Sequence, residues 1–249
     1  MRVLFPAAGP LPDGDLEELY DPGPGPSLRA GFVVGVDGSA AVEGRSSGLR
    51  TSSDARVFHA LRAVSDAVVV GARTARLERY GPVVLRAQGA GWRQATGRRA
   101  DVPLVVVTRS LDLDPSARLF TGTRPLVVTC ATAQAGRRET MSRVADVLVC
   151  GDDDVDLSAA VAALRSRGLT RLLCEGGPSL LTGLLAKDLV DELCFTVSPA
   201  LTGGGQVLPA ALAEPVALAL RGVVDGGDGA LLCRWSVQRD RGGPPAPVR

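Results

Sequence analysis

Short apolar runs alternate with amphipathic segments through most of the chain. The runs are rich in β-branched residues and lack an apolar–polar alternation, which is typical of strands buried on both faces of a parallel sheet. They occupy residues 31–36, 67–70, 104–107, 126–129, 147–150 and 172–174. Helical periodicity occurs at residues 53–64, 157–167 and 179–187. This order predicts strand–helix units that build a mostly parallel sheet.

Two of the predicted helices are preceded by residues that suit an N-terminal cap. Ser52 or Ser53 is expected to cap the first helix. Asp156, or the acids before it, is expected to cap the second, where negative charge complements the helix dipole. The acidic run 152–154 is therefore interpreted as a helix-entry loop and not as a metal site.

The pattern changes after residue 189. Longer strand-like segments at 191–198, 216–224 and 230–237 are separated by glycine-rich turns, which predicts an antiparallel extension of the same sheet. The chain is thus expected to form one α/β domain with a mixed, mostly parallel sheet and C-terminal antiparallel strands. We place this domain at residues 30–240. An N-terminal arm, 1–29, with one short helical turn precedes it, and a flexible tail, 241–249, follows it.

Composition narrows the class of protein. A formal net charge of +1 argues against a nucleic-acid-binding or membrane-surface protein, because both need a basic face. The five cysteines form an odd set without C-x-x-C spacing, and most lie beside apolar runs, so we expect reduced, buried side chains and leave a catalytic thiol as the alternative. A signal-peptide core and a membrane-spanning run are both missing, which favours a cytoplasmic protein.

The segment Glu175-Gly176-Gly177-Pro178-Ser179-Leu180 joins an apolar run to a predicted helix. Two glycines allow a close backbone approach, Pro178 suits the first helical position, and free N–H groups at a helix start bind anions. The segment is a candidate phosphate cradle. An ordinary strand-to-helix turn is the alternative.

Two further strand ends carry residues suited to a dinucleotide. Gly71 follows the run 67–70, and Thr74 with neighbouring arginines offers a hydroxyl and positive charge. After the run 104–107, Arg109 and Ser110 suit an adenosine 2′-phosphate, which distinguishes NADPH from NADH. A solvated turn explains each of them equally well when each is considered alone.

A fourth segment suits a phosphorylated small molecule. Asp37 supplies a carboxylate at the end of the run 31–36, and the loop 44–52 is rich in hydroxyls and arginine, which form charge-assisted bonds to phosphate. A solvent-facing loop is the alternative. The sole histidine, His59, lies inside a predicted helix, and the chain has no zinc-ligand pattern, no serine-hydrolase elbow and no Walker or G-x-G-x-x-G motif, so no metal is expected.

Taken in order, these segments resemble the reductase domain of bacterial riboflavin biosynthesis, and the N-terminal arm resembles that of stand-alone actinobacterial members. The resemblance covers about residues 30–237 and implies a three-layer, dihydrofolate-reductase-like α/β fold. Its most specific parts are Val36-Asp37-Gly38, Arg45-Ser46-Ser47-Gly48, Leu61-Arg62-Ala63, Val70-Gly71-Ala72-Arg73-Thr74, Tyr80-Gly81-Pro82, Glu175-Gly176-Gly177-Pro178-Ser179-Leu180 and Leu189-Val190-Asp191-Glu192.

The resemblance implies reduction of 5-amino-6-(5-phosphoribosylamino)uracil by NADPH in a homodimer. It assigns Ser47, Arg62 and Glu175 to the substrate, and it places Asp37 at the floor of the site. Asp37 and Glu175 are the candidate proton donors, with water as the alternative. The residues expected to contact NADPH are Gly71, Thr74, Glu78, Arg109, Ser110, Gly176, Gly177, Pro178, Ser179 and Leu180. A pterin-type reductase on the same fold and a non-catalytic NADPH-binding protein are the competing functions.

Overall fold

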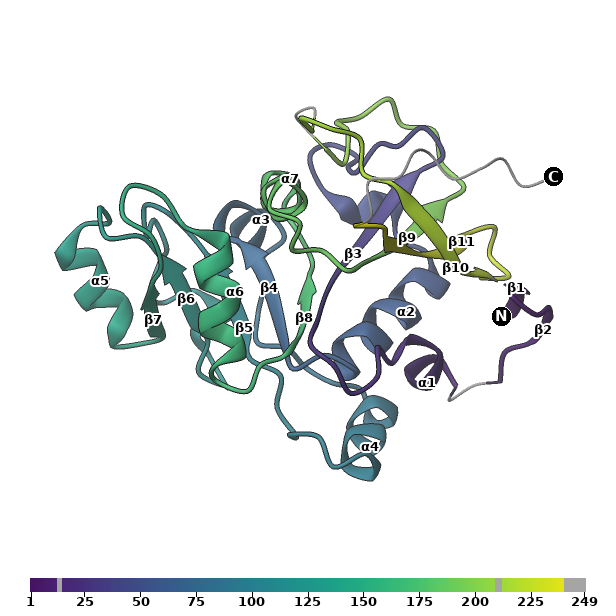
Figure 1. Cartoon of the computed structure of the whole chain (residues 1–249), viewed down its shortest axis with the longest axis horizontal. Helices are drawn as coiled ribbons and strands as arrows, with labels where there is room; N and C mark the ends of the chain where they lie inside the picture. The colour runs from purple at the N-terminus through teal and green to yellow at the C-terminus, as the bar shows by residue number, and fades with distance from the viewer. Residues whose placement is uncertain (13–14, 209–211, 240–249) are drawn as a thin grey trace.

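The apolar runs form neighbouring parallel strands of one eleven-stranded sheet, shown in Figure 1. The computed structural model describes residues 1–12, 15–208 and 212–239, so the predicted tail 241–249 lies outside the described residues. The strands that match the runs are β3 (Ser27–Gly35), β4 (Ala67–Gly71), β5 (Leu104–Val107), β6 (Leu126–Thr129), β7 (Asp146–Val149) and β8 (Arg171–Cys174). Their spatial order, β3-β8-β4-β5-β6-β7, is parallel throughout, as predicted.

The late strands extend this sheet on its other side. β9 (Glu192–Ser198) is parallel to β3, whereas the pairs β9–β11, β11–β10 and β10–β1 are antiparallel. The antiparallel extension is thus confirmed for β10 (Leu218–Asp225) and β11 (Leu231–Val237). The prediction that residues 191–198 are antiparallel to their neighbours was wrong on one side, because β9 runs parallel to β3. The reason is the helix between β8 and β9, which carries the chain back across the sheet so that β9 enters from the same edge as β8.

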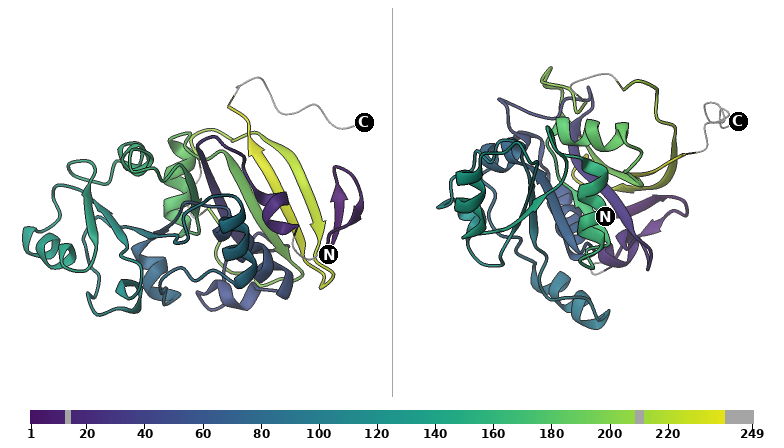
Figure 2. Two further views of the ribbon diagram at one scale, coloured as in Figure 1. Left: turned by 90° about the horizontal axis from the view of Figure 1, so that it is seen from below. Right: turned by 60° about the vertical axis from the view of Figure 1, so that its left-hand side comes forward.

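Helices cover both faces of the sheet, which gives the expected three layers (Figure 2). Alternate residues of β4 serve the two cores: Val69 packs with α6 and α7, and Val68 and Val70 pack with α1, α2 and α3. The helices are α1 (Leu16–Tyr20), α2 (Ser52–Ala63), α3 (Ala72–Leu77), α4 (Ala87–Ala95), α5 (Ala135–Ser142), α6 (Leu157–Arg165) and α7 (Pro178–Ala186), with short 3₁₀ helices at Ser46–Leu49 and Arg118–Phe120.

The caps of α2 and α6 differ in how well the pattern predicted them. Asp156 caps α6 as expected, since its carboxylate accepts from the backbone N–H groups of Ser158 and Ala159 over 2.9 and 3.1 Å. The prediction of Ser52 or Ser53 as the cap of α2 was wrong. Thr51, in an extended conformation, is the cap and accepts from Asp54 N over 3.2 Å. The serine hydroxyls donate to Asp228 instead.

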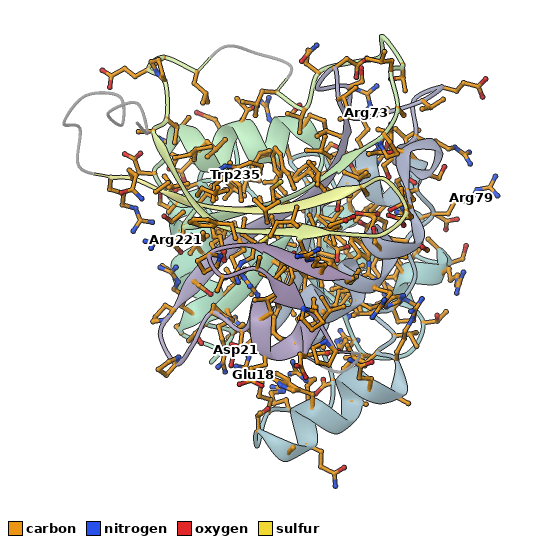
Figure 3. All side chains as sticks on the ribbon, turned by 90° about the vertical axis from the view of Figure 1, so that its right-hand side faces the viewer. Glu18, Asp21, Arg73, Arg79, Arg221 and Trp235 are labelled. Carbon is orange, nitrogen blue, oxygen red and sulfur yellow. The ribbon has the colours of Figure 1, made fainter. Side chains whose placement is uncertain are left out.

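The N-terminal arm is built into the domain. Its strands β1 (Arg2–Phe5) and β2 (Gly9–Pro10) continue the sheet beyond β10, and β3 begins at Ser27, so the last residues of the segment 1–29 belong to the central sheet. The carbonyl groups of Leu19 and Tyr20 accept hydrogen bonds from Arg234 and Arg29. Asp21, labelled beside Glu18 in Figure 3, accepts from Arg98 over 2.7 Å.

Tyr20 is 1% exposed within the core that α1 and α2 share. Replacing it with alanine is expected to lower the free energy of unfolding by about 3–5 kcal/mol, because a large buried ring is lost and leaves a cavity. Chemical denaturation measures this change. Tyr20→Phe keeps the ring and is the control, with an expected loss of about 1 kcal/mol or less. An alanine variant as stable as the phenylalanine variant would show that the arm adds nothing to this core.

Candidate functional site

A pocket of about 370 Å³ opens where β3 loses one of its neighbours. β3 pairs with β8 only as far as Ala30, but it stays paired with β9 as far as Gly35. The edge of β3 from Gly31 onward is therefore free of β8, and Gly31, Phe32 and Val33 line the pocket. α2, α3 and the start of α7 supply the other walls, so the pocket lies at the carboxyl end of the parallel strands, as in other open α/β sheets.

The glycine motif and the Gly71 turn meet on one side of this pocket. Gly71 N donates to Gly176 O over 2.8 Å. A side chain at position 177 would place its Cβ 2.3 Å from Thr74 Oγ1, so only glycine fits at this position. α7 begins at Pro178 with no side-chain cap, which leaves the first N–H groups of the helix open to an anion. The two candidate phosphate-binding segments thus form a single concave surface.

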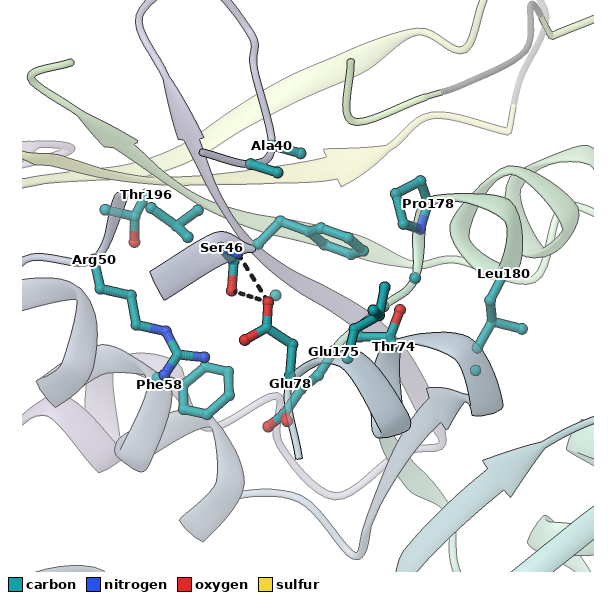
Figure 4. A pocket seen from close by; sticks show the side chains of 18 of the residues that line it. Ala40, Ser46, Arg50, Phe58, Thr74, Glu78, Glu175, Pro178, Leu180 and Thr196 are labelled. Atoms are coloured by element: carbon teal, nitrogen blue, oxygen red, sulfur yellow. Dashed lines mark hydrogen bonds between the residues drawn. The ribbon is translucent and has the colours of Figure 1, made fainter. Parts of the chain in front are cut away.

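The pocket brings together most of the residues predicted for a cofactor. Thr74, Pro178 and Leu180 lie together at one end of the view in Figure 4. Arg109 and Ser110 do not line the pocket; they follow β5, whose last residue pairs with Gly71, and so lie along the same sheet edge. The predicted residues that do line it are Gly71, Thr74, Glu78, Glu175, Gly176, Gly177, Pro178, Ser179 and Leu180.

Glu175 lies at the end of β8 with its side chain fully buried. Its carboxylate accepts two hydrogen bonds from Arg62, over 2.6 and 2.7 Å, and one from the Tyr80 hydroxyl over 2.9 Å. Burial alone would lower the pKa of Arg62, but the contact with Glu175 raises it on balance. Burial and the same carboxylate raise the pKa of Tyr80 well above its usual value. Arg62 also lies 4.3 Å from the centre of the Phe58 ring, a pocket residue. It therefore acts on the pocket through Glu175 and Phe58.

The serine that the structure places in the pocket is Ser46, one residue before the predicted Ser47. Ser46 begins a 3₁₀ helix, and both its N–H and its hydroxyl donate to the Glu78 carboxylate, over 2.8 and 3.1 Å (Figure 4). Ser47 is exposed and does not line the pocket. The resemblance had assigned Ser47 to the substrate. A 3₁₀ turn rotates successive side chains by about 120°, so of these two neighbouring serines Ser46 faces the pocket and Ser47 faces away from it.

Asp37 does not line the pocket, although the resemblance placed it at the floor of the site. Its carboxylate accepts from the backbone N–H groups of Thr202, Gly203 and Ser39, over 2.9, 2.7 and 3.1 Å. These bonds hold the pKa of Asp37 well below its usual range. The residue therefore joins the loop after β3 to the loop after β9, and the neighbouring residues Ala40 and Gly205 line the pocket.

Several residues without a predicted role line the end of the pocket away from the glycine motif. Arg50 and Thr196 are both labelled at that end of the view in Figure 4, and the Arg50 guanidinium lies 5.6 Å from the centre of the Phe58 ring. Asp54 lines the same pocket from the first turn of α2. Arg50 belongs to the loop 44–52, which had been singled out from the sequence for its arginines and hydroxyls. Asp54 and Phe58 could not be predicted, because helix periodicity does not show which face of α2 meets β9.

His59 stands apart from the main pocket. It lines a separate groove of about 220 Å³ between α1, α2 and α4, and burial followed by the nearby Arg86 lowers its pKa. The cysteines are buried and free, as expected. Within the described ranges, no cluster of three or more possible ligand side chains is arranged to hold a metal ion, and no helix is long and apolar enough to cross a membrane.

Replacing Glu175 with glutamine is expected to lower the free energy of unfolding by roughly 3 kcal/mol, because Arg62 then keeps its charge without a counterion. Denaturant titration measures this change. Glu139→Gln is a matched control: Glu139 pairs with Arg143 on an exposed helix face, and its loss should cost about 0.5 kcal/mol or less. Equal losses in the two variants would show that the buried pair contributes no more than a surface pair.

Comparisons with known proteins agree with this geometry. The family described as the RibD C-terminal domain matches residues 26–232. A protein of Archaeoglobus fulgidus named 2,5-diamino-6-ribosylamino-4(3H)-pyrimidinone 5′-phosphate reductase is 32% identical over 72% of this chain and 83% of its own length. The protein of that name from Methanothermobacter thermautotrophicus is 30% identical over 72% of this chain and 80% of its own length.

Solved structures show the same fold. A pyrimidine reductase-like protein from Corynebacterium diphtheriae superposes with a TM-score of 0.78 at 30% identity, over 93% of this chain and 97% of that one. RibD from Acinetobacter baumannii shares the fold at a TM-score of 0.67 and 19% identity, over 86% of this chain and 59% of that one. The family expected from the motifs is confirmed. The chain belongs to the RibD C-terminal domain family.

Proposed function

We propose that this chain is the NADPH-dependent reductase that converts a 6-(5-phosphoribosylamino)pyrimidine to its ribitylamino product in riboflavin biosynthesis. The observation that carries the proposal is one pocket with two unlike ends: a glycine-lined helix start suited to a dinucleotide, and an end with Arg50, Asp54 and Thr196 suited to a polar heterocycle. The names of the curated relatives support the same reaction.

The residues present fit a nicotinamide dinucleotide. The close approach of Gly177 to Thr74 and the uncapped start of α7 form a cradle that a larger side chain would fill. Arg73 lines the same pocket and adds positive charge. Arg109 and Ser110 follow the next strand along the sheet edge, where they would hold a 2′-phosphate and so select NADPH. A bound nicotinamide would supply the hydride.

The other end of the pocket would bind the pyrimidine phosphate. Arg50 and Ser46 offer a cation and a hydroxyl for the phosphoribosyl group. The ribosylamine must open to an imine before C1′ accepts hydride, and its nitrogen then takes a proton. Holding that carbon beside the cofactor end supplies much of the rate. Asp37 is assigned no proton transfer, and water or a pocket carboxylate supplies the proton. Association of two copies stays a prediction of the resemblance, and a cytoplasmic location stays a prediction from the sequence composition.

Purified protein should oxidise NADPH when it is given at least one of the two phosphoribosylaminopyrimidines, the uracil or the 2-aminopyrimidinone. It should not oxidise NADPH when it is given dihydrofolate. Mass spectrometry of the product should show the gain of two hydrogens.

Arg109→Ala is expected to raise the KM for NADPH about tenfold and to leave that for NADH unchanged, since it removes one charge-assisted phosphate contact. Arg138→Ala, at a half-buried arginine that lies on α5 and outside the pocket, is the control. Turnover of dihydrofolate alone would contradict the proposal.

Replacing Asp37 with asparagine tests whether this residue positions the pocket or transfers a proton. The amide oxygen cannot accept all three N–H groups, so the two loops should loosen and the KM for the substrate should rise roughly 5–10-fold with kcat nearly unchanged. The dependence of kcat on pH should keep its shape, because the depressed pKa of Asp37 leaves it ionised across the neutral range. If the variant lost one limb of the pH profile of kcat, Asp37 would have to be a proton-transfer residue.

A further inference from the structure

Three carboxylates line the pocket, and two of them are already bonded by the protein. Glu175 accepts from Arg62 and Tyr80, and Glu78 accepts from Ser46. Asp54 differs, because within the described residues no ion pair holds its carboxylate, and Thr196 is the side chain whose hydroxyl favours its ionised form. A carboxylate has about four acceptor sites, so Asp54 keeps most of its capacity for a ligand.

Asp54 is buried in the pocket wall. It is 7% exposed and lies in the first turn of α2, where its own N–H donates to Thr51. Thr196, its partner on β9, lies at the pocket end that also contains Arg50 and is remote from Pro178 and Leu180 in Figure 4. Asp54 thus belongs to the substrate end of the pocket and not to the cofactor end.

The groups around Asp54 act on its pKa in opposite directions, and the pKa is raised on balance. Burial raises its pKa, while the Thr196 hydroxyl and the Arg50 guanidinium lower it. Asp228, in the turn between β10 and β11, raises it further, although the Asp228 carboxylate is itself occupied by Ser52 and Ser53. A ligand that donates two hydrogen bonds would favour the ionised form.

The two phosphoribosylaminopyrimidines considered for this site differ at C2 and in the hydrogen on N1. The compound named for the curated relatives carries an amino group at C2, whereas the uracil has a carbonyl oxygen there. The N3–H and the 2-amino group form two adjacent donors, which match both oxygens of an ionised carboxylate. In the uracil the N3–H stands between two carbonyl oxygens, so one carboxylate oxygen would face an acceptor. A buried polar site rejects a ligand that leaves its groups unpaired.

We propose that Asp54 is the specificity-determining residue of this site and that it selects 2-aminopyrimidin-4-one substrates over uracils by accepting from N3–H and the 2-amino group. This inference rests on the proposed function and deepens it. It also places the reaction in a sequence: hydrolytic deamination at C2, with water added and ammonia released, must follow this reduction and not precede it.

The test compares kcat/KM for the two 5′-phosphorylated pyrimidines at saturating NADPH. The wild-type protein should prefer the 2-amino compound by about 100-fold or more. Asp54→Asn replaces one acceptor with a donor, which matches N3–H beside a carbonyl, so the preference should fall to near unity or reverse. Glu78→Gln, at another pocket carboxylate, should lower both rates and keep the ratio. Unchanged NADPH affinity shows that the asparagine variant is folded.

The pH dependence gives a second readout. When the Asp54 carboxylate is protonated, it offers one donor and one acceptor instead of two acceptors. Lowering the pH should therefore lower kcat/KM for the 2-amino compound, which presents two donors, and raise kcat/KM for the uracil, which presents one donor beside an acceptor. The asparagine variant should lose both trends. A wild-type protein that reduces the uracil as fast as the 2-amino compound, or an unchanged ratio in Asp54→Asn, overturns the inference alone. Failure to reduce either compound overturns the proposed function, and this inference with it.

Discussion

A buried carboxylate must obtain its hydrogen-bond donors from the protein, and this requirement at Glu175 organises the site. Glu175 directly follows β8, whereas its partners Arg62 and Tyr80 come from α2 and from the segment after α3. The three bonds therefore fix a helix, a strand and a loop relative to one another at the bottom of the pocket. Because breaking such a pair leaves an uncompensated buried charge, the arrangement tolerates little movement.

The shape of the pocket depends on the lengths of the sheet strands as much as on the sequence motifs. β3 continues past the end of β8, and its glycine at position 31 lets Leu61 and Leu173 pack closely, since a Cβ there would lie 3.3 and 3.4 Å from them. The motifs at Gly71 and Gly176 then close one side by packing against each other. Asp37 secures the opposite side by holding the loops after β3 and β9 together. The pocket thus combines a rigid cofactor end with a substrate end that is partly formed by two joined loops.

Much of the fold could be predicted because fully buried parallel strands have a distinctive composition, as residues 105–106 and 127–128 show. The pattern missed α5, in which Met141 alone is buried, and α4, which contains two glycines, because neither has a continuous apolar face. In the site, the glycine motif was recognisable because it needs a special backbone. Asp54 and Tyr80 were not, since their roles depend on which distant elements meet them.

The arm has a consequence for how the chain completes its fold. β1 pairs with β10, and the carbonyl of Leu19 is bonded by Arg234, 215 residues further along the chain. Contacts between such distant segments form late, since a long loop must close first. During synthesis β1 therefore cannot join the sheet until β10 has emerged, although Leu16 and Tyr20 can already pack against α2.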